Sequence, residues 1–89
     1  MFRVRWEQRA LNELASLWAQ ADSSLRRAIT RASHHIDQLL RKDPHNQGES
    51  RSASRRIMFV PPLAASFRIE PDGHTVSVLG IRPLRRRRP

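Results

Sequence analysis

Arginine is the residue type with the clearest chemical potential in this chain, because it supplies sixteen of the seventeen basic side chains. A guanidinium group forms two parallel hydrogen bonds with a phosphate or a carboxylate, which a lysine ammonium cannot do. Nine arginines follow position 50, where Glu70 and Asp72 are the only acidic residues. The net charge of +9 indicates an anionic partner. A GC-rich coding bias is an alternative explanation for the ratio of arginine to lysine, but not for the surplus charge.

Several of these arginines lie in segments that alternate between apolar and polar residues, as half-buried strands do. The predicted strands are residues 2–6, 55–60, 63–69 and 74–81. In the third of them one face is apolar and consists of Leu63, Ala65, Phe67 and Ile69. Arg68 falls on the opposite face, as do Arg3 and Arg5 in the first strand. The sequence therefore predicts a sheet with one covered face and one face rich in arginine.

The cover is expected from residues 7–20 and 22–41, where apolar residues recur at helical spacing. The second of these segments has a regular stripe that includes Ile29, Ala32, Ile36 and Leu39. So few residues separate the two helices that they must form an antiparallel hairpin. Pro61-Pro62 and the sequence Pro71-Asp72-Gly73 are turns that join the later strands into a meander, with Gly73 free to adopt a positive φ.

The expected fold is one α+β domain over residues 1–82, followed by a basic tail over residues 83–89. Its order is an N-terminal strand, an antiparallel helix hairpin and a three-stranded antiparallel meander, with the helices packed on one face of the sheet. The first strand is expected at or near an edge. Residues 45–54 are predicted as a polar loop.

The composition and the residue spacing exclude several classes of function. No cysteine is present, so disulfides and thiolate metal sites are excluded. No apolar run approaches the roughly 20 residues of a membrane helix, and the first residues do not resemble a signal peptide. His34, His35 and His74 do not have the spacing of metal ligands. We expect a cytoplasmic protein without a cofactor or a metal.

The order of elements and many short motifs resemble the RelE/ParE family of toxins from bacterial type II toxin–antitoxin modules. Residues 4–6, followed by residues 9–14 (RALNEL), are similar to the family's opening strand and its "A-L-x-E-L" first helix. Further similar segments follow in the family's order at residues 43–44, 48–51, 55–57, 62–63, 66–69 and 76–82. The resemblance covers residues 2–82.

The resemblance implies a toxin that is neutralised by a small antitoxin protein wrapped around it. RelE-like members enter the ribosomal A site and cut mRNA, whereas ParE-like members poison DNA gyrase. We expect ribosome-dependent mRNA cleavage, with gyrase inhibition as the alternative. A third hypothesis is a catalytically inactive relic that binds nucleic acid or an antitoxin-like partner.

RNA cleavage needs a base for the ribose 2′-hydroxyl, cations for the charge of the phosphorane and an acid for the leaving oxygen. The resemblance places arginines at the family's second-strand basic positions and near its C-terminal basic position. Glu49 is the candidate base, and an ordinary loop carboxylate paired with an arginine is the alternative. The expected catalytic residues are Arg55, Arg56, Arg82 and Glu49. The residues expected to bind nucleic acid are Arg51, Arg68 and Arg85.

Two departures from the family pattern favour the gyrase alternative. The family's third-strand arginine is expected about four residues before Ile69, where Ala64 and Ala65 stand instead. The C-terminal tyrosine or histidine is missing, since the chain has no tyrosine and its last residues are arginine and proline.

The large apolar residues supply expectations about packing and about the partner. Trp6 and Trp18 are expected to fill the interface between the sheet and the helices. Leu17, Leu25 and Leu40 fall off the main helical stripes and are expected to leave apolar grooves on the hairpin. An antitoxin is expected to anchor there with apolar side chains and to contact arginines of the sheet face with carboxylates.

Overall fold

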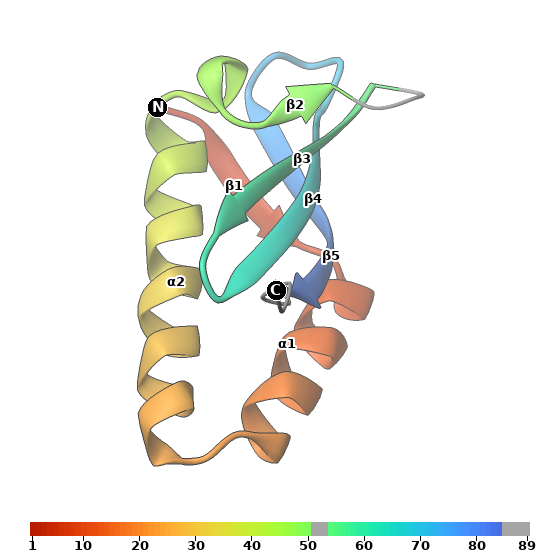
Figure 1. The fold of residues 1–89 in the computed structure, drawn as a ribbon. Helices are drawn as coiled ribbons and strands as arrows, with labels where there is room; N and C mark the ends of the chain where they lie inside the picture. Colours follow the sequence, from red (N-terminus) through yellow and green to blue (C-terminus); the bar gives the residue numbers. More distant parts are fainter. Residues whose placement is uncertain (51–53, 85–89) are drawn as a thin grey trace.

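The structure is a computed structural model that describes residues 1–50 and 54–84. Its elements in chain order are β1 (Arg3–Trp6), α1 (Gln8–Gln20), α2 (Ser23–Lys42), the 3-10 turn η1 (Pro44–Asn46), β2 (Glu49–Ser50), β3 (Arg55–Val60), β4 (Leu63–Ile69) and β5 (Thr75–Pro83) (Figure 1). No helix in this described part is long and apolar enough to span a membrane.

The five strands form one mixed sheet in the order β1-β5-β4-β3-β2. β3, β4 and β5 are the predicted antiparallel meander, and β1 pairs in parallel with β5 at one edge, which confirms its expected position. Residues 49–50 differ from the predicted loop. They form the short strand β2, because Glu49 pairs with Ile57 and Ser50 with Arg56 of β3.

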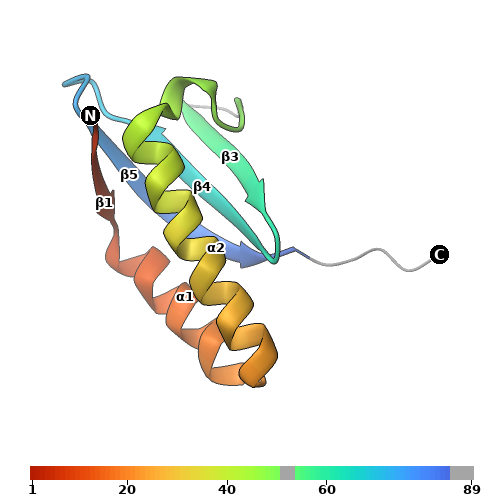
Figure 2. The ribbon, with the colours of Figure 1, turned by 90° about the vertical axis from the view of Figure 1, so that its left-hand side faces the viewer.

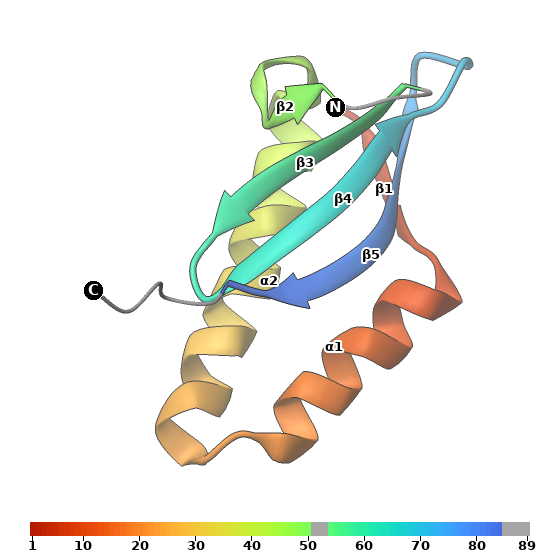
Figure 3. The ribbon, with the colours of Figure 1, turned by 45° about the vertical axis from the view of Figure 1, so that its right-hand side comes forward.

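The helices cover one face of this sheet and leave the other open (Figures 2 and 3). α2 lies behind β3 and β4 in Figure 3 and also packs against β1, while α1 runs beside β5. The alternation predicted for β4 is confirmed, since Leu63, Ala65 and Phe67 are buried beneath the helices. The core is completed by the buried residues Ala10, Ile29, Ala32, Ile36, Leu40, Met58, Val76, Val78 and Ile81.

The hairpin itself extends beyond the sheet at the α1–α2 connection, so residues near that end lack a surface to pack against (Figures 1 and 3). Leu25, in the first turn of α2, is 43% exposed. Leu40 lies at the opposite end of α2, beneath the sheet, and is fully buried. The expectation of an exposed groove at Leu40 is therefore wrong. Leu17 packs against the core and is partly buried.

The two tryptophans have different surroundings. Trp6 packs against the core and donates a 3.2 Å hydrogen bond from Nε1 to Asp37. Trp18 is 44% exposed, so its expected place in the sheet–helix interface is wrong. Arg26 explains its position, because the Arg26 guanidinium lies 4.2 Å from the centre of the indole ring and donates to the Trp18 carbonyl oxygen at 2.9 Å. This arrangement joins the end of α1 to the start of α2.

Two glycines have the left-handed backbone conformation that favours glycine. Gly73, in the turn between β4 and β5, has φ +75°, as predicted. Gly48, just before β2, has φ +72°, and a Cβ atom there would lie 2.5 Å from the carbonyl oxygen of Ile57. The backbone of Gly48 therefore passes too close to β3 for any side chain.

Candidate anion-binding pocket on the open sheet face

The strand register brings arginines from distant parts of the sequence into one row on the open face. Arg55 pairs with Arg68, which pairs with Ser77, which in turn pairs with Arg5. Paired residues on neighbouring strands point to the same side of a sheet. The arginine-rich face predicted from sequence alternation is thus formed by β1, β4 and β3.

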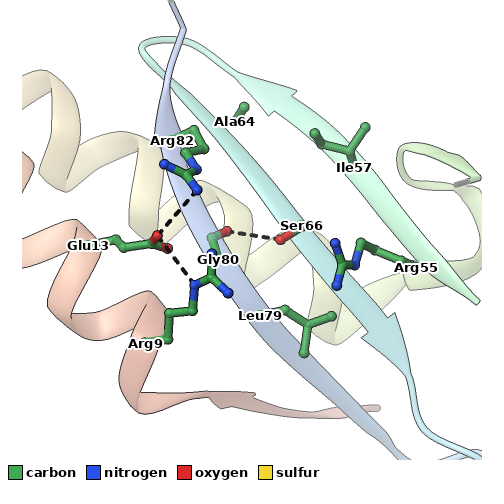
Figure 4. A pocket seen from close by; sticks show the side chains of 9 residues that line it. All are labelled: Arg9, Glu13, Arg55, Ile57, Ala64, Ser66, Leu79, Gly80 and Arg82. Atoms are coloured by element: carbon green, nitrogen blue, oxygen red, sulfur yellow. Dashed lines mark hydrogen bonds and ion pairs between the residues drawn. The ribbon is translucent and has the colours of Figure 1, made fainter. Parts of the chain in front are cut away.

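A pocket of about 420 Å³ lies beside this row, between α1 and the strands β3, β4 and β5 (Figure 4). Its basic lining comes from three elements, with Arg9 on α1, Arg55 on β3 and Arg82 on β5. Its remaining lining residues are Glu13, Ile57, Ala64, Ser66, Leu79 and Gly80. Apolar walls beneath guanidinium groups suit a ligand with both an apolar body and an anionic group.

Glu13 connects α1 to β5 at one wall of this pocket. Its Oε1 atom accepts a 2.9 Å hydrogen bond from the backbone N–H of Ile81. Its Oε2 atom lies 3.5 Å from Nε of Arg9 and 3.9 Å from Nη2 of Arg82. The carboxylate therefore orients two of the three arginines (Figure 4). Arg55 differs from them, since it makes no ion pair within the described residues.

Gly80 allows this close approach of α1 to β5. A Cβ atom at position 80 would lie 3.2 Å from Oε1 of Glu13 and 3.1 Å from Oγ of Ser66. Both distances are shorter than ordinary van der Waals contacts. The missing side chain thus leaves room for the Glu13 carboxylate against the strand.

A second polar cluster occupies the same face nearer to β1. Glu70 accepts hydrogen bonds from the Ser77 hydroxyl and from Nη2 of Arg68, the latter at 3.3 Å. Arg5 donates to Oγ of the fully buried Ser77 at 3.2 Å. The Ser77 bond, followed by the contacts with Arg68 and Arg5, lowers the pKa of Glu70 below its ordinary value. The charge of Arg68 is therefore already partly balanced inside the protein.

The structure brings together only some of the residues predicted to form the site. Arg55 and Arg82 line the pocket, and Glu49 faces the same side as the lining residue Ile57, with which it pairs. Arg56 points to the opposite side of β3 and donates to the carbonyl oxygens of His45 and Gln47 at 2.9 and 3.4 Å. Arg51 and Arg85 lie outside the described residues.

Sequence reasoning missed two contributors to the pocket, Arg9 and Glu13. Both belong to the segment RALNEL, a motif that indicates the first helix but not a role in a site. Their spacing of four residues, which places two side chains on one helix face, was the available signal. Within residues 1–50 and 54–84 no group of three or more acidic or histidine side chains could hold a metal ion.

Comparisons with known proteins relate this fold to solved structures. No model of a known protein family matches the sequence, and no curated protein matches it. A chain from the chromosomal ParDE TA system of P. aeruginosa has a TM-score of 0.76 at 17% identity, over 96% of this chain and 98% of that chain. A chain of the RelBE2 toxin–antitoxin complex from Mycobacterium tuberculosis has a TM-score of 0.69 at 15% identity, covering 92% and 90%. The isolated E. coli RelE toxin has a TM-score of 0.65 at 12% identity, covering 98% and 88%.

These similarities extend over nearly the whole length of each chain, while the sequence identities are low. They establish the fold, which is that of the RelE/ParE toxins. The resemblance seen in the sequence motifs is confirmed at this level.

Proposed function

We propose that this protein is the toxin of a type II toxin–antitoxin module. The support is the fold, shared over nearly the full chain with proteins described as a ParDE TA system, a RelBE2 toxin–antitoxin complex and a RelE toxin. We further propose that its target is anionic. The support is the net charge of +9 and the pocket lined by Arg9, Arg55 and Arg82.

The target that the pocket geometry favours is RNA, and the proposed activity is ribosome-dependent cleavage of mRNA. The single observation that carries this proposal is the convergence of three arginines over apolar walls on the open sheet face. A nucleotide has the matching parts, because its base is flat and apolar on its faces and its phosphate accepts bidentate hydrogen bonds from arginine.

Each residue has a specific role in this proposal. Arg55 and Arg82 stabilise the charge that develops on the phosphorane, and Glu49 removes the proton of the 2′-hydroxyl, whose oxygen attacks the phosphorus. The bond from phosphorus to the 5′-oxygen breaks, and the 5′-oxygen takes its proton from solvent water. Arg68 grips the RNA backbone beside the pocket. Arg56 has no direct role, because its side chain binds two carbonyl oxygens on the other side of β3.

The test is controlled expression of the protein without any partner, followed by growth measurement and mapping of mRNA ends. The unchanged chain should stop growth and produce cuts at A-site codons, whereas Arg55→Ala and Arg82→Ala should each relieve the block. Arg31→Ala is the matched control, because Arg31 is exposed on α2, away from the pocket. Unchanged growth and intact mRNA on expression of the original chain would refute the proposal.

Gyrase inhibition is the second candidate. The superposition on the ParDE chain, at a TM-score of 0.76, exceeds those on RelBE2 and RelE, at 0.69 and 0.65. The missing tyrosine points in the same direction. Induction of the DNA-damage response with intact mRNA would decide for gyrase. Both targets lie in the cytoplasm, which is where we propose the protein acts.

The proposed partner is a small antitoxin with an acidic, amphipathic segment. An apolar hollow of about 300 Å³ between α1 and α2 is lined by Leu11, Leu14, Ala15, Trp18, Ile29, Thr30 and Ser33. The adjoining surface beside Trp18 carries Arg26, Arg27 and Arg31. Apolar anchors with flanking carboxylates match this surface. Co-purification with the product of a neighbouring gene tests the partnership, and an inactive relic would bind such a partner without stopping growth.

A further inference from the structure

The Glu13 carboxylate lies where an anionic ligand of the pocket would be expected. The backbone N–H of Ile81 donates a hydrogen bond to it, and the guanidinium groups of Arg9 and Arg82 form ion pairs with it at 3.5 and 3.9 Å. A pair of arginines with a main-chain amide is also a donor set that proteins use for phosphate oxygens. The protein's own carboxylate thus occupies an anion position.

Two features show that the structure is built around this carboxylate. Position 80 is a glycine, and a Cβ atom there would lie 3.2 Å from Oε1 of Glu13. Glu13 is also the best-covered member of its ion pairs, with 23% of its side chain exposed against 70% for Arg9 and 68% for Arg82. The carboxylate is held against β5, whereas the two arginines can turn towards a ligand in solvent.

We propose that Glu13 is an internal stand-in for phosphate, which competes with an incoming phosphate group for Arg9 and Arg82. Small free anions must displace these contacts and bind weakly. A polynucleotide also gains the contact with Arg55, which makes no ion pair within the described residues. Glu13 therefore makes the pocket selective for an extended phosphate chain over single phosphate ions. This inference rests on the proposed role of the pocket as a phosphate site.

The test is a titration of the full chain with inorganic phosphate at constant ionic strength. Binding is monitored through the NMR signals of the Ile81 amide and the Arg9 Nε–H. Glu13→Gln keeps an oxygen that accepts from Ile81 and removes the negative charge beside both arginines. Because two unit charges about 4 Å apart in water interact by ~1 kcal/mol, phosphate should bind roughly fivefold more tightly to this variant.

The matched control is Glu7→Gln, which removes a carboxylate 3.5 Å from Arg5 and changes the net charge equally, outside the pocket lining. This variant should change phosphate affinity less than twofold. Three results would overturn the proposal. They are equal effects of the two substitutions on phosphate affinity, weaker phosphate binding by Glu13→Gln than by the original chain, and no phosphate binding by either variant. If Glu13→Gln does not fold, Glu13→Asp replaces it in the test. This substitution shortens the side chain by one methylene and moves the carboxylate away from both arginines, so it should also tighten phosphate binding.

The titration is independent of toxicity. Loss of growth inhibition with the expected phosphate response would count against the proposed function alone. Growth inhibition without the phosphate response would count against the role of Glu13 alone.

Discussion

At the scale of single residues, the adjacent arginines Arg55 and Arg56 have different roles, because their side chains point to opposite faces of β3. Successive side chains of β3 point to opposite faces of the sheet. Arg55 lines the pocket, while Arg56 donates to the carbonyl oxygens of His45 and Gln47 and so fixes η1 and the approach to β2. One residue thus serves the proposed activity and its neighbour serves stability.

Replacement of Arg56 by Ala should lower the free energy of unfolding by about 1 kcal/mol, because two carbonyl oxygens lose their charged donor. Replacement of Arg55 by Ala should leave that free energy nearly unchanged and should abolish toxicity. Chemical denaturation followed by circular dichroism measures both effects. Equal stability of the two variants would contradict the separation of roles.

The Glu70 cluster predicts a specific dependence of stability on pH. The pKa of Glu70 is lower in the folded protein than in the unfolded chain, first through the Ser77 hydroxyl and then through Arg68. Its stabilising contribution is therefore present above the ordinary glutamate pKa of about 4.3 and is lost as pH falls through the lower folded value. The difference in unfolding free energy between the original chain and Ser77→Ala should shrink as pH is lowered across this range. A constant difference would contradict the assignment.

At the scale of elements, the segment that leads into β2 depends on a glycine that passes close to β3. Replacement of Gly48 by Ala should destabilise the protein by about 1–3 kcal/mol from the backbone conformation alone, with an added cost from the contact with the Ile57 carbonyl oxygen. Gly73→Ala is the matched control, because its φ of +75° is almost the same but a Cβ atom there meets nothing within 4 Å. Thermal unfolding should therefore show the larger loss for Gly48→Ala.

The elements were largely predictable from the sequence, since period-two and helical spacing report burial on a strand or helix directly. β3 and β4 have the predicted bounds, and both helices agree to within a residue or two. β2 was missed because two residues are too few for a pattern. Trp18 was misplaced because helical spacing reports a shared side of the helix but not where the sheet beneath it ends.

The site was less predictable than the elements. The motif order is enough to predict Arg55 and Arg82 as site residues. To know that Arg55 faces the pocket and Arg56 faces away from it, one must also know which side chains of β3 point towards the core. The inclusion of Arg9 requires the position of α1 beside β5, which is set by the contact of Glu13 with Ile81. Contacts of this kind join residues far apart in the chain and leave no local pattern in a single sequence.

At the scale of the whole molecule, two separate functional surfaces are proposed, and α1 contributes different side chains to each. The basic pocket lies on the open sheet face, and the apolar hollow lies between the helices. The combined variant Leu11→Ala, Trp18→Ala should therefore keep its toxicity but resist neutralisation by the antitoxin. Arg82→Ala should show the reverse, with no toxicity and retained co-purification. Loss of both properties in either variant would show that the surfaces are not separate.

The parallel pairing of β1 with β5 has a consequence for the order in which the protein is made. Arg5 and Ser77, which meet across this pair, are 72 positions apart in the sequence. Synthesis runs from the N-terminus, so β1 has no strand partner until β5 has left the ribosome. β5 also carries Gly80 and Arg82, and the donor Ile81 N–H that holds Glu13. A nascent chain that stops short of this strand therefore has neither the complete five-stranded sheet nor the pocket, so the proposed activity requires that β5 has been added.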